Sequence, residues 1–274
     1  MLTKKALSDS EFELFQKLIY DKVGIDISSK KKVMLQSRLS RLLFDMECDS
    51  YLELYQRIKK DYSGEKVVEL INLITTNVTS FFRESHQWHY LHNELASIIN
   101  NKNRSIRIWS AACASGEEPY TIAIFLAENL PSLELWDIKI LATDISDKAL
   151  KKAQRGIYRD QDIASLPKYY VKKYFHETLL PKREYHISEE LKKMVLYRKF
   201  NLVHGDYSIF HHKFDMIFLK NVIIYFDKEV QNRVIANIAK SMYSGSYLFL
   251  GHSESILHND DGLEYIDSSI YRKK

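Results

Sequence analysis

The chain has 274 residues, of which 45% are hydrophobic and 28% charged, and this composition is that of a globular protein with room for two domains. Its formal net charge of +4 permits an acidic partner without indicating nucleic acid. We expect no secretory signal, no transmembrane helix and no direct membrane insertion, because no stretch of the required length is apolar throughout. Cys48 and Cys113 are too few for a disulfide framework or a metal site, so we expect a cytoplasmic protein that needs no metal.

The first part of the chain predicts helices alone. Ser8 and Glu11 have the spacing of a capping box at the start of the first helix, and Ser28 or Ser29 is expected to cap the second. Two further segments also place apolar residues at helical spacing. We therefore predict an all-α domain over residues 1–75. The apolar positions behind this prediction are Phe12, Phe15, Ile19, Val23, Leu35, Leu39, Leu42, Leu43, Met46, Tyr51, Leu54, Tyr55, Ile58, Val67, Leu70, Ile71 and Ile74.

Beyond this domain the pattern changes to one of strands and helices. Residues 75–85 are predicted to be a non-helical link, because their Thr and Asn side chains compete for backbone hydrogen bonds, and residues 88–99 predict an amphipathic helix. The alternation from about residue 105 indicates an α/β domain with a largely parallel sheet. Residues 157–193 interrupt the alternation and are predicted to form an insertion. The expected strands are 106–113, 138–146, 195–202, 214–221 and 246–253, and the expected helices are 118–130, 147–154 and 228–243.

Polar residues stand at the ends of three predicted strands. The first strand leads into ASGEEP (114–119), the second ends in Asp144 and the third in Asn201. Ligands of open α/β sheets bind outside the carboxyl ends of the strands, and an acid after the second strand can accept hydrogen bonds from ribose hydroxyls. Each residue also has a plainer interpretation, since Glu117 and Glu118 suit the start of any helix and Asp144 can cap the next one. Together they favour a nucleoside-type site.

The charge of this predicted site separates two cofactor classes. The chain has no G-x-G-x-x-G turn, which a dinucleotide needs for its pyrophosphate, and two carboxylates follow the first strand instead. Carboxylates repel phosphate and tolerate a cation. S-adenosyl-L-methionine carries a sulfonium, an ammonium and a ribose, so the charges favour it over a nicotinamide cofactor.

Five motifs resemble one known family, the CheR-type chemotaxis protein methyltransferases. They are TTNVTSFFRE, WSAACASGEEPYTIAI, LATDIS followed by AQRGIY, KNVIIYF and LFLGHSES, in the family's order and spacing across nearly the whole chain. The resemblance implies an α/β fold with a Rossmann-like S-adenosylmethionine methyltransferase domain over residues 76–274. It also implies a small inserted β-subdomain at about 157–193 and an all-α N-terminal helical domain over residues 1–75.

The resemblance further implies which residues form the site. Arg83 and Tyr225 match the residues that aim the substrate carboxylate, although by themselves they suit a surface arginine and a core tyrosine. Glu118 is preferred to Glu117 on the resemblance alone. Lys220 stands where family members commonly have Arg, and it keeps the charge but loses the planar fork. The residues that match cofactor contacts are Asn77, Thr79, Arg83, Glu118, Asp144, Asn201, Leu202, Lys220 and Asn221.

For function, the resemblance implies methylation of glutamate side chains on bacterial chemoreceptors, which turns S-adenosyl-L-methionine into S-adenosyl-L-homocysteine. The implied partner is the cytoplasmic domain of methyl-accepting chemotaxis receptors, and the implied oligomeric state is a monomer. HETLLPKREYHI in the insertion lacks the turn glycines of members that dock a receptor peptide, so we expect no such docking. Two alternatives stay open, a methyltransferase acting on RNA or a small molecule and a non-catalytic cofactor-binding signalling module. A run of basic residues is by itself usually a solvated face, but the resemblance implies that this helix faces the receptor through Lys30, Lys31, Lys32, Arg38 and Arg41.

Overall fold

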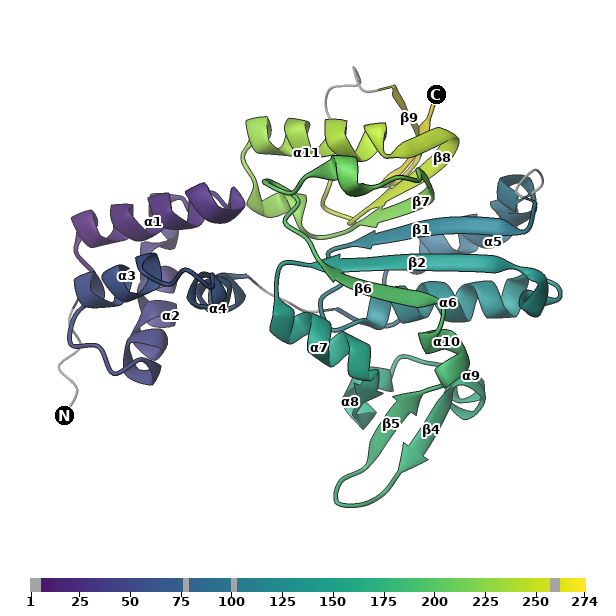
Figure 1. Cartoon of the computed structure of the whole chain (residues 1–274), viewed down its shortest axis with the longest axis horizontal. Helices are drawn as coiled ribbons and strands as arrows, with labels where there is room; N and C mark the ends of the chain where they lie inside the picture. The colour runs from purple at the N-terminus through teal and green to yellow at the C-terminus, as the bar shows by residue number, and fades with distance from the viewer. Residues whose placement is uncertain (1–5, 76–78, 100–102, 257–261) are drawn as a thin grey trace. The chain divides into compact units, whose positions relative to one another are not determined.

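The computed structural model describes residues 6–75, 79–99, 103–256 and 262–274 (Figure 1). It divides into two compact units, one of residues 1–77 with 225–231 and the other of residues 78–224 with 232–274. Among the described residues, no helix is long and apolar enough to cross a membrane.

The first unit is a bundle of four α-helices, as predicted. The Ser8 side chain accepts a hydrogen bond from the Glu11 N–H, and the Glu11 carboxylate accepts one from the Ser8 N–H, so the predicted capping box is confirmed. The expected cap of the second helix is wrong, because neither Ser28 nor Lys31 makes a side-chain capping bond and a short 3₁₀ turn precedes that helix. The helices are α1 (Asp9–Val23), α2 (Lys32–Asp45), α3 (Tyr51–Lys59) and α4 (Glu65–Ile74), after the 3₁₀ turn η1 (Ser29–Lys31).

The second unit is built on a seven-stranded sheet with the order β6-β2-β1-β7-β8-β10-β9. The first five strands in this order are parallel to one another. At the edge, β10 is antiparallel to both of its neighbours, β8 and β9. Every residue of β7 is buried, as expected for a central strand that helices cover. The strands are β1 (Ser105–Ala111), β2 (Asp137–Asp144), β6 (Val195–Lys199), β7 (Phe214–Leu219), β8 (Met242–Leu250), β9 (Leu263–Asp267) and β10 (Ile270–Lys273).

Helices follow β1, β2 and β7, whereas only a 3₁₀ turn lies between β6 and β7, and the predicted alternation of strands and helices is confirmed. The link 79–84 contains no helix, also as predicted. The sequence analysis missed β9 and β10, which are short and have mostly exposed or partly exposed positions in β9. The helices are α5 (Ser85–Ile99), α6 (Glu117–Asn129), α7 (Asp147–Arg155) and α11 (Lys228–Lys240), with 3₁₀ turns η2 (Leu133–Leu135), η3 (Tyr207–Ile209) and η4 (Ile223–Tyr225).

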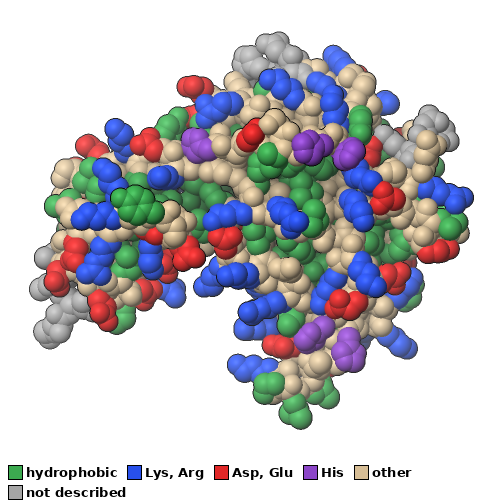
Figure 2. All heavy atoms as spheres, in the orientation of Figure 1, with side chains coloured by type: hydrophobic (Ala, Val, Ile, Leu, Met, Phe, Trp, Pro, Cys, Tyr) green, Lys and Arg blue, Asp and Glu red, His purple; other side chains and the backbone are tan. Residues whose placement is uncertain are grey.

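The predicted insertion forms a separate small sheet between α7 and β6. Its three strands have the order β3-β5-β4 and are antiparallel, and the β4–β5 hairpin extends away from the large sheet in Figure 1. Hydrophobic side chains gather at the hairpin tip in Figure 2, where Leu179 and Leu180 are exposed. The elements are β3 (Ile157–Tyr158), α8 (Asp160–Ile163), α9 (Lys168–Tyr174), β4 (Phe175–Thr178), β5 (Glu184–Ile187) and α10 (Glu189–Lys192).

The helical unit allows a test of its predicted core. Leu54 of α3 is fully buried, whereas Leu52 on the same helix is 47% exposed. We expect Leu54→Ala to lower the free energy of unfolding by about 2–5 kcal/mol, because it removes buried apolar atoms and leaves a cavity. Leu52→Ala should change it by less than about 0.5 kcal/mol. Urea unfolding followed by far-UV circular dichroism measures both, and equal losses would contradict the assigned burial.

Candidate functional site

The candidate site lies where the strand order reverses. Strand β1 pairs in parallel with β2 on one side and with β7 on the other, so the carboxyl ends of all three strands lie at the same edge of the sheet. From β1 the chain continues to β2 and β6 on one side, and then returns to β7 and β8 on the other side of β1. Open α/β sheets bind ligands at such a point. Glu118 follows β1, Asp144 ends β2 and Lys220 follows β7, whereas the predicted strand-end residue Asn201 follows β6, which pairs with β2.

The turn after β1 is tight because residues of two other segments press against it. Gly116, at the N-cap of α6, has a φ of +95°, and a Cβ atom there would lie 2.8 Å from the Cβ atom of Ala153. Ser115 precedes it, and its carbonyl accepts a hydrogen bond of 3.1 Å from the Tyr158 hydroxyl. The position therefore requires glycine, and the AQRGIY segment supports the turn from the side of α7 and β3.

Asp144 closes this turn at the end of β2. Its carboxylate accepts hydrogen bonds of 2.9 Å from the backbone N–H groups of Ala114 and Ser146. Burial raises the pKa of Asp144, and these two N–H groups oppose the rise. The plainer interpretation of Asp144 as a helix cap is wrong, because Ser146 caps α7 through a bond from Ala149. A carboxylate accepts about four hydrogen bonds, so Asp144 keeps capacity for ligand hydroxyls.

The two acids at the start of α6, which the sequence alone could not separate, have different surroundings. Glu117 is 3% exposed and its carboxylate accepts from the Ser115 hydroxyl at 2.7 Å, so it stabilises its own turn. The Glu118 carboxylate instead accepts from the Ser110 hydroxyl of β1 at 2.6 Å and lies 3.6 Å from the Lys220 ammonium. Burial raises the pKa of Glu118, and Lys220 and Ser110 lower it.

Lys220, directly after β7, is held in a charged cluster. Its side chain is 5% exposed, and its ammonium lies 3.2 Å from Glu84 and 3.6 Å from Glu118, neither pair having the geometry of a good hydrogen bond. The ammonium also lies 5.6 Å from the ring centre of Trp88 and 5.9 Å from that of Phe218. One ammonium therefore lies between two carboxylates that have little contact with solvent.

Four of the remaining predicted contacts belong to loops. Thr79 and Arg83 lie in the link before α5 and are partly buried, and the Arg83 carbonyl accepts bonds from the Trp88 indole at 3.0 Å and from Lys220 at 3.4 Å. The Asn201 side chain accepts bonds from backbone N–H groups of its own turn, and Leu202 beside it is buried. These bonds give Asn201 a local structural role alongside its predicted one.

The remaining predicted residues are Asn221, Tyr225 and Asn77. Asn221 follows Lys220 with a φ of +58°, and its backbone N–H donates to Glu254 at 2.7 Å. Tyr225 ends η4 and clusters with the helical unit, where its carbonyl accepts from the Asp26 N–H at 3.0 Å. Asn77 lies outside the described residues.

The sequence analysis missed several residues that shape this edge of the sheet. The Glu84 carboxylate accepts from the His252 N–H at 2.8 Å in addition to pairing with Lys220. Gln87 is fully buried and its amide donates to the Leu250 carbonyl at 2.7 Å. Gln87 belongs to the buried face of α5 but lies just before the predicted helix 88–99, so that prediction gave no signal for it, and nothing in the sequence distinguished Glu84 from a surface acid.

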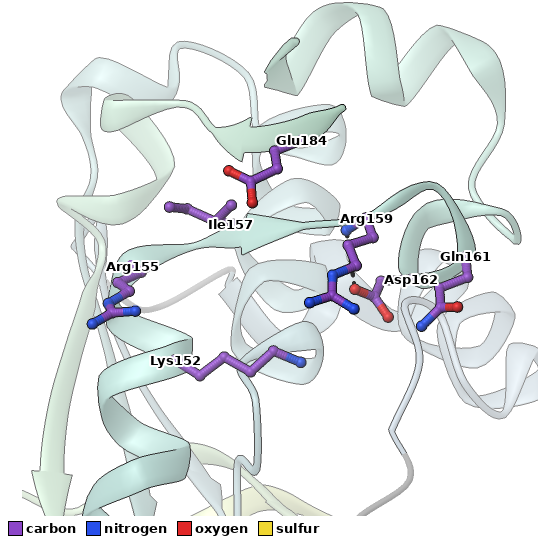
Figure 3. A pocket seen from close by; sticks show the side chains of 7 residues that line it. All are labelled: Lys152, Arg155, Ile157, Arg159, Gln161, Asp162 and Glu184. Atoms are coloured by element: carbon purple, nitrogen blue, oxygen red, sulfur yellow. Dashed lines mark hydrogen bonds between the residues drawn. The ribbon is translucent and has the colours of Figure 1, made fainter. Parts of the chain in front are cut away.

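A separate hollow lies beside the inserted subdomain (Figure 3). Its volume is about 300 Å³, and basic and acidic side chains both line it, among them Lys152, Arg159 and Glu184. Lys and Arg side chains also gather over the neighbouring α7 in Figure 2. None of the predicted site residues lines this hollow, so the candidate cofactor site is the strand-end edge.

The strand-end residues fit the chemistry of S-adenosyl-L-methionine. The Asp144 carboxylate has unused acceptor capacity for ribose hydroxyls, and the cluster of Glu84, Glu118 and Lys220 offers charges of both signs to an amino-acid group. A glycine-rich phosphate cradle is not part of the turn, whose helix begins with two acids. The edge therefore suits a cationic nucleoside better than a pyrophosphate.

Comparisons with known proteins agree along the whole chain. Residues 77–272 match the family described as "CheR methyltransferase, SAM binding domain", and residues 10–75 match "CheR methyltransferase, all-alpha domain". The chain is 40% identical over 273 residues to the chemotaxis protein methyltransferase of Borreliella burgdorferi, covering 97% of this chain and 95% of that protein. It is 35% identical over 281 residues to the chemotaxis protein methyltransferase of Escherichia coli, covering 99% and 93%. It is 34% identical to chemotaxis protein methyltransferase 2 of Pseudomonas aeruginosa, covering 95% and 92%.

We expect the affinity for S-adenosyl-L-homocysteine to depend on pH through Asp144. Because burial raises the Asp144 pKa, the carboxylate takes up a proton at a higher pH than an exposed aspartate, and affinity should fall as pH drops through that range. Asp144→Asn should weaken binding about 10- to 150-fold at neutral pH and remove this part of the pH dependence. Calorimetric titration from pH 4.5 to about 8 measures this. Asp147→Asn is the control, since Asp147 pairs with Lys199 instead, and an equal loss there would contradict the assignment.

We expect Lys220→Met to destabilise the second unit by about 3–5 kcal/mol, because it leaves two buried carboxylates without a counter-charge. Lys213→Met is the control, since Lys213 is exposed just before the same strand. All three tryptophans, Trp88, Trp109 and Trp136, lie in the second unit, so urea unfolding followed by tryptophan fluorescence reports on it alone. A Lys220→Met loss no larger than that of the control would show that the cluster does not need its ammonium.

Proposed function

Because the chain belongs to the CheR family of chemotaxis methyltransferases, whose cofactor is S-adenosyl-L-methionine, we propose that it methylates specific glutamate side chains of bacterial chemoreceptors. The products are glutamyl methyl esters and S-adenosyl-L-homocysteine, and the substrate is the cytoplasmic domain of methyl-accepting chemotaxis receptors. The observation that carries the proposal is the match of both domains to chemotaxis protein methyltransferases over nearly the full length of the chain.

The reaction requires no general acid–base catalysis by the protein. The cofactor supplies an electrophilic methyl group. A glutamate side chain with an ordinary pKa of about 4.3 is already ionised at neutral pH, so its oxygen attacks without a general base. The protein's own residues then have to position that carboxylate, exclude water from it and leave it unprotonated.

Arg83 and Tyr225 are the residues that we propose for positioning the substrate. An arginine grips a carboxylate through its fork of donors, and a tyrosine hydroxyl adds one hydrogen bond, and neither has to transfer a proton. The Arg83 carbonyl accepts bonds from Trp88 and Lys220, which fix the backbone from which its half-buried guanidinium extends. The Tyr225 backbone is likewise fixed by the bond from Asp26.

The proposed receptor-facing surface is the basic helix α2 with the residues before it. Lys30 and Lys31 are exposed in η1. Three further cations have local contacts, because Lys32 pairs with Asp9 at 2.6 Å, Arg41 lies 3.8 Å from Asp45 and Arg38 donates to the Leu73 carbonyl. Exposed pairs of this kind are weak, so these cations can exchange their local partners for receptor carboxylates.

The proposal predicts alkali-labile methyl transfer. Purified protein with methyl-labelled S-adenosyl-L-methionine and chemoreceptor-containing membranes of the same organism should yield label that mild alkali releases as methanol. We expect Tyr225→Phe to lower the rate about 10-fold and Arg83→Ala about 100-fold, because each loses a group that orients the carboxylate. Tyr265→Phe should leave the rate unchanged, since Tyr265 is 62% exposed in the C-terminal hairpin.

Alkali-stable label, or label in RNA, would reject glutamate esterification and support a methyltransferase of another substrate. Binding of S-adenosyl-L-homocysteine without any transfer to the receptor membranes would favour a non-catalytic signalling module.

A further inference from the structure

Glu254, in the segment after β8, accepts hydrogen bonds on both of its carboxylate oxygens. The residue is 4% exposed, and its carboxylate accepts five hydrogen bonds from backbone N–H groups. Four of the five donors are consecutive residues of the loop after β7. The donors are Asn221 and Gly251 to Oε2, both at 2.7 Å, and Val222 and Ile223 at 2.9 Å with Ile224 at 3.3 Å to Oε1.

The loop after β7 needs such an acceptor to keep its shape. Its helix η4 has three residues, too few to supply partners for its own first N–H groups. Asn221 before it has a φ of +58°, which turns the following N–H groups towards one point. A ring of converging backbone N–H groups is an anion-binding arrangement, and here the anion is a side chain of the same chain. Without Glu254, the N–H groups of residues 221–224 would lose this acceptor, and three of these four residues are buried or partly buried.

Strand pairing brings the two segments together. Strands β7 and β8 are parallel, and Leu219 stands opposite Leu250, so the residues that follow each strand lie side by side. Gly251 allows the close approach, because a Cβ atom there would lie 2.7 Å from Glu254 Oε2 and 2.8 Å from the Asn221 nitrogen. The Gly251 carbonyl accepts a bond of 3.1 Å from the Ser269 hydroxyl, which anchors the segment on its other side.

We propose that Glu254 is a positioning residue, which holds the loop of residues 220–225 in the conformation that binds cofactor and substrate. The inference rests on the function proposed above, because that loop begins with Lys220 and Asn221, the predicted cofactor contacts, and ends with Tyr225, the predicted substrate contact. Glu254 touches neither ligand and acts through the backbone of the loop.

The isosteric variant Glu254→Gln tests this in the full chain. It keeps the volume of the side chain but turns an NH₂ group towards two or three N–H donors, whichever way the amide faces. We expect its Kd for S-adenosyl-L-homocysteine, measured by calorimetry, to rise at least about 10-fold. This binding assay needs no receptor, so it stays informative if the proposed receptor methylation fails. Where methylation is observed, kcat at saturating cofactor should fall as well, because Tyr225 ends the same loop.

A matched control separates positioning from general destabilisation. Asp215, at the other end of β7, is also a carboxylate with 4% exposure, and it accepts a backbone N–H bond of 2.8 Å from Arg107. Asp215→Asn should lower the melting temperature while leaving the Kd within about twofold of the unchanged protein, because it lies at the amino end of the strand, away from the site.

Unchanged affinity in Glu254→Gln would overturn the proposal, and so would an equal loss of affinity in Asp215→Asn. If Glu254→Gln does not fold, Gly251→Ala takes its place and keeps the charge, since the added methyl group would lie 2.6 Å from the Asn221 side-chain nitrogen, 2.7 Å from Glu254 Oε2 and 2.8 Å from the Asn221 backbone nitrogen. Gly251→Ala should then show the same rise in Kd, and a folded Gly251→Ala with unchanged affinity would equally overturn the proposal.

Discussion

The buried charge of Lys220 is the interaction on which the cofactor edge depends. Its ammonium joins three segments that are far apart in the sequence, through Glu84 before α5, Glu118 at the start of α6 and its own place after β7. Two carboxylates in a dry environment repel each other, and a lone ammonium there would be poorly solvated. Each segment is therefore stable in its observed place only when the other two are present, which couples the link, the first turn and the strand end.

Parallel strand pairing explains how so much of this edge could be predicted. Runs of apolar residues located β1, β2, β6, β7 and β8, and in a parallel sheet the residues that follow such runs must meet at one edge. The strand ends alone therefore predicted that the ASGEEP turn, Asp144 and Asn201 lie at this edge, whereas Glu118 and Lys220 were assigned from the family resemblance. The all-α first domain and the inserted subdomain were predictable for a similar reason, since each changes the periodicity of the chain.

The contact partners of individual side chains could not be predicted from the order of the strands. Glu117 and Glu118 are neighbours with the same chemistry, and only the packing of α6 on the sheet turns one towards Ser115 and the other towards Lys220. Glu84 and Glu254 lie in motifs that carry the family resemblance, but their burial was not predicted, because burial of a charge depends on partners that the sequence does not identify. Strands β9 and β10 escaped notice because a short edge hairpin has too few alternations to distinguish it from a loop.

The cluster also suits a lysine at a position where the family resemblance implies an arginine. A guanidinium binds best through a planar fork to one carboxylate, whereas an ammonium is a compact charge that several oxygens can share. The Lys220 ammonium has four oxygens between 3.2 and 3.6 Å, from Glu84, Glu118, Gln87 and the Arg83 carbonyl. These contacts are long and shared among four oxygens, so they depend on the positive charge of the residue more than on the direction of its N–H bonds. A lysine ammonium provides that charge. The directional hydrogen bonds of this loop are made instead by its backbone N–H groups, which donate to Glu254.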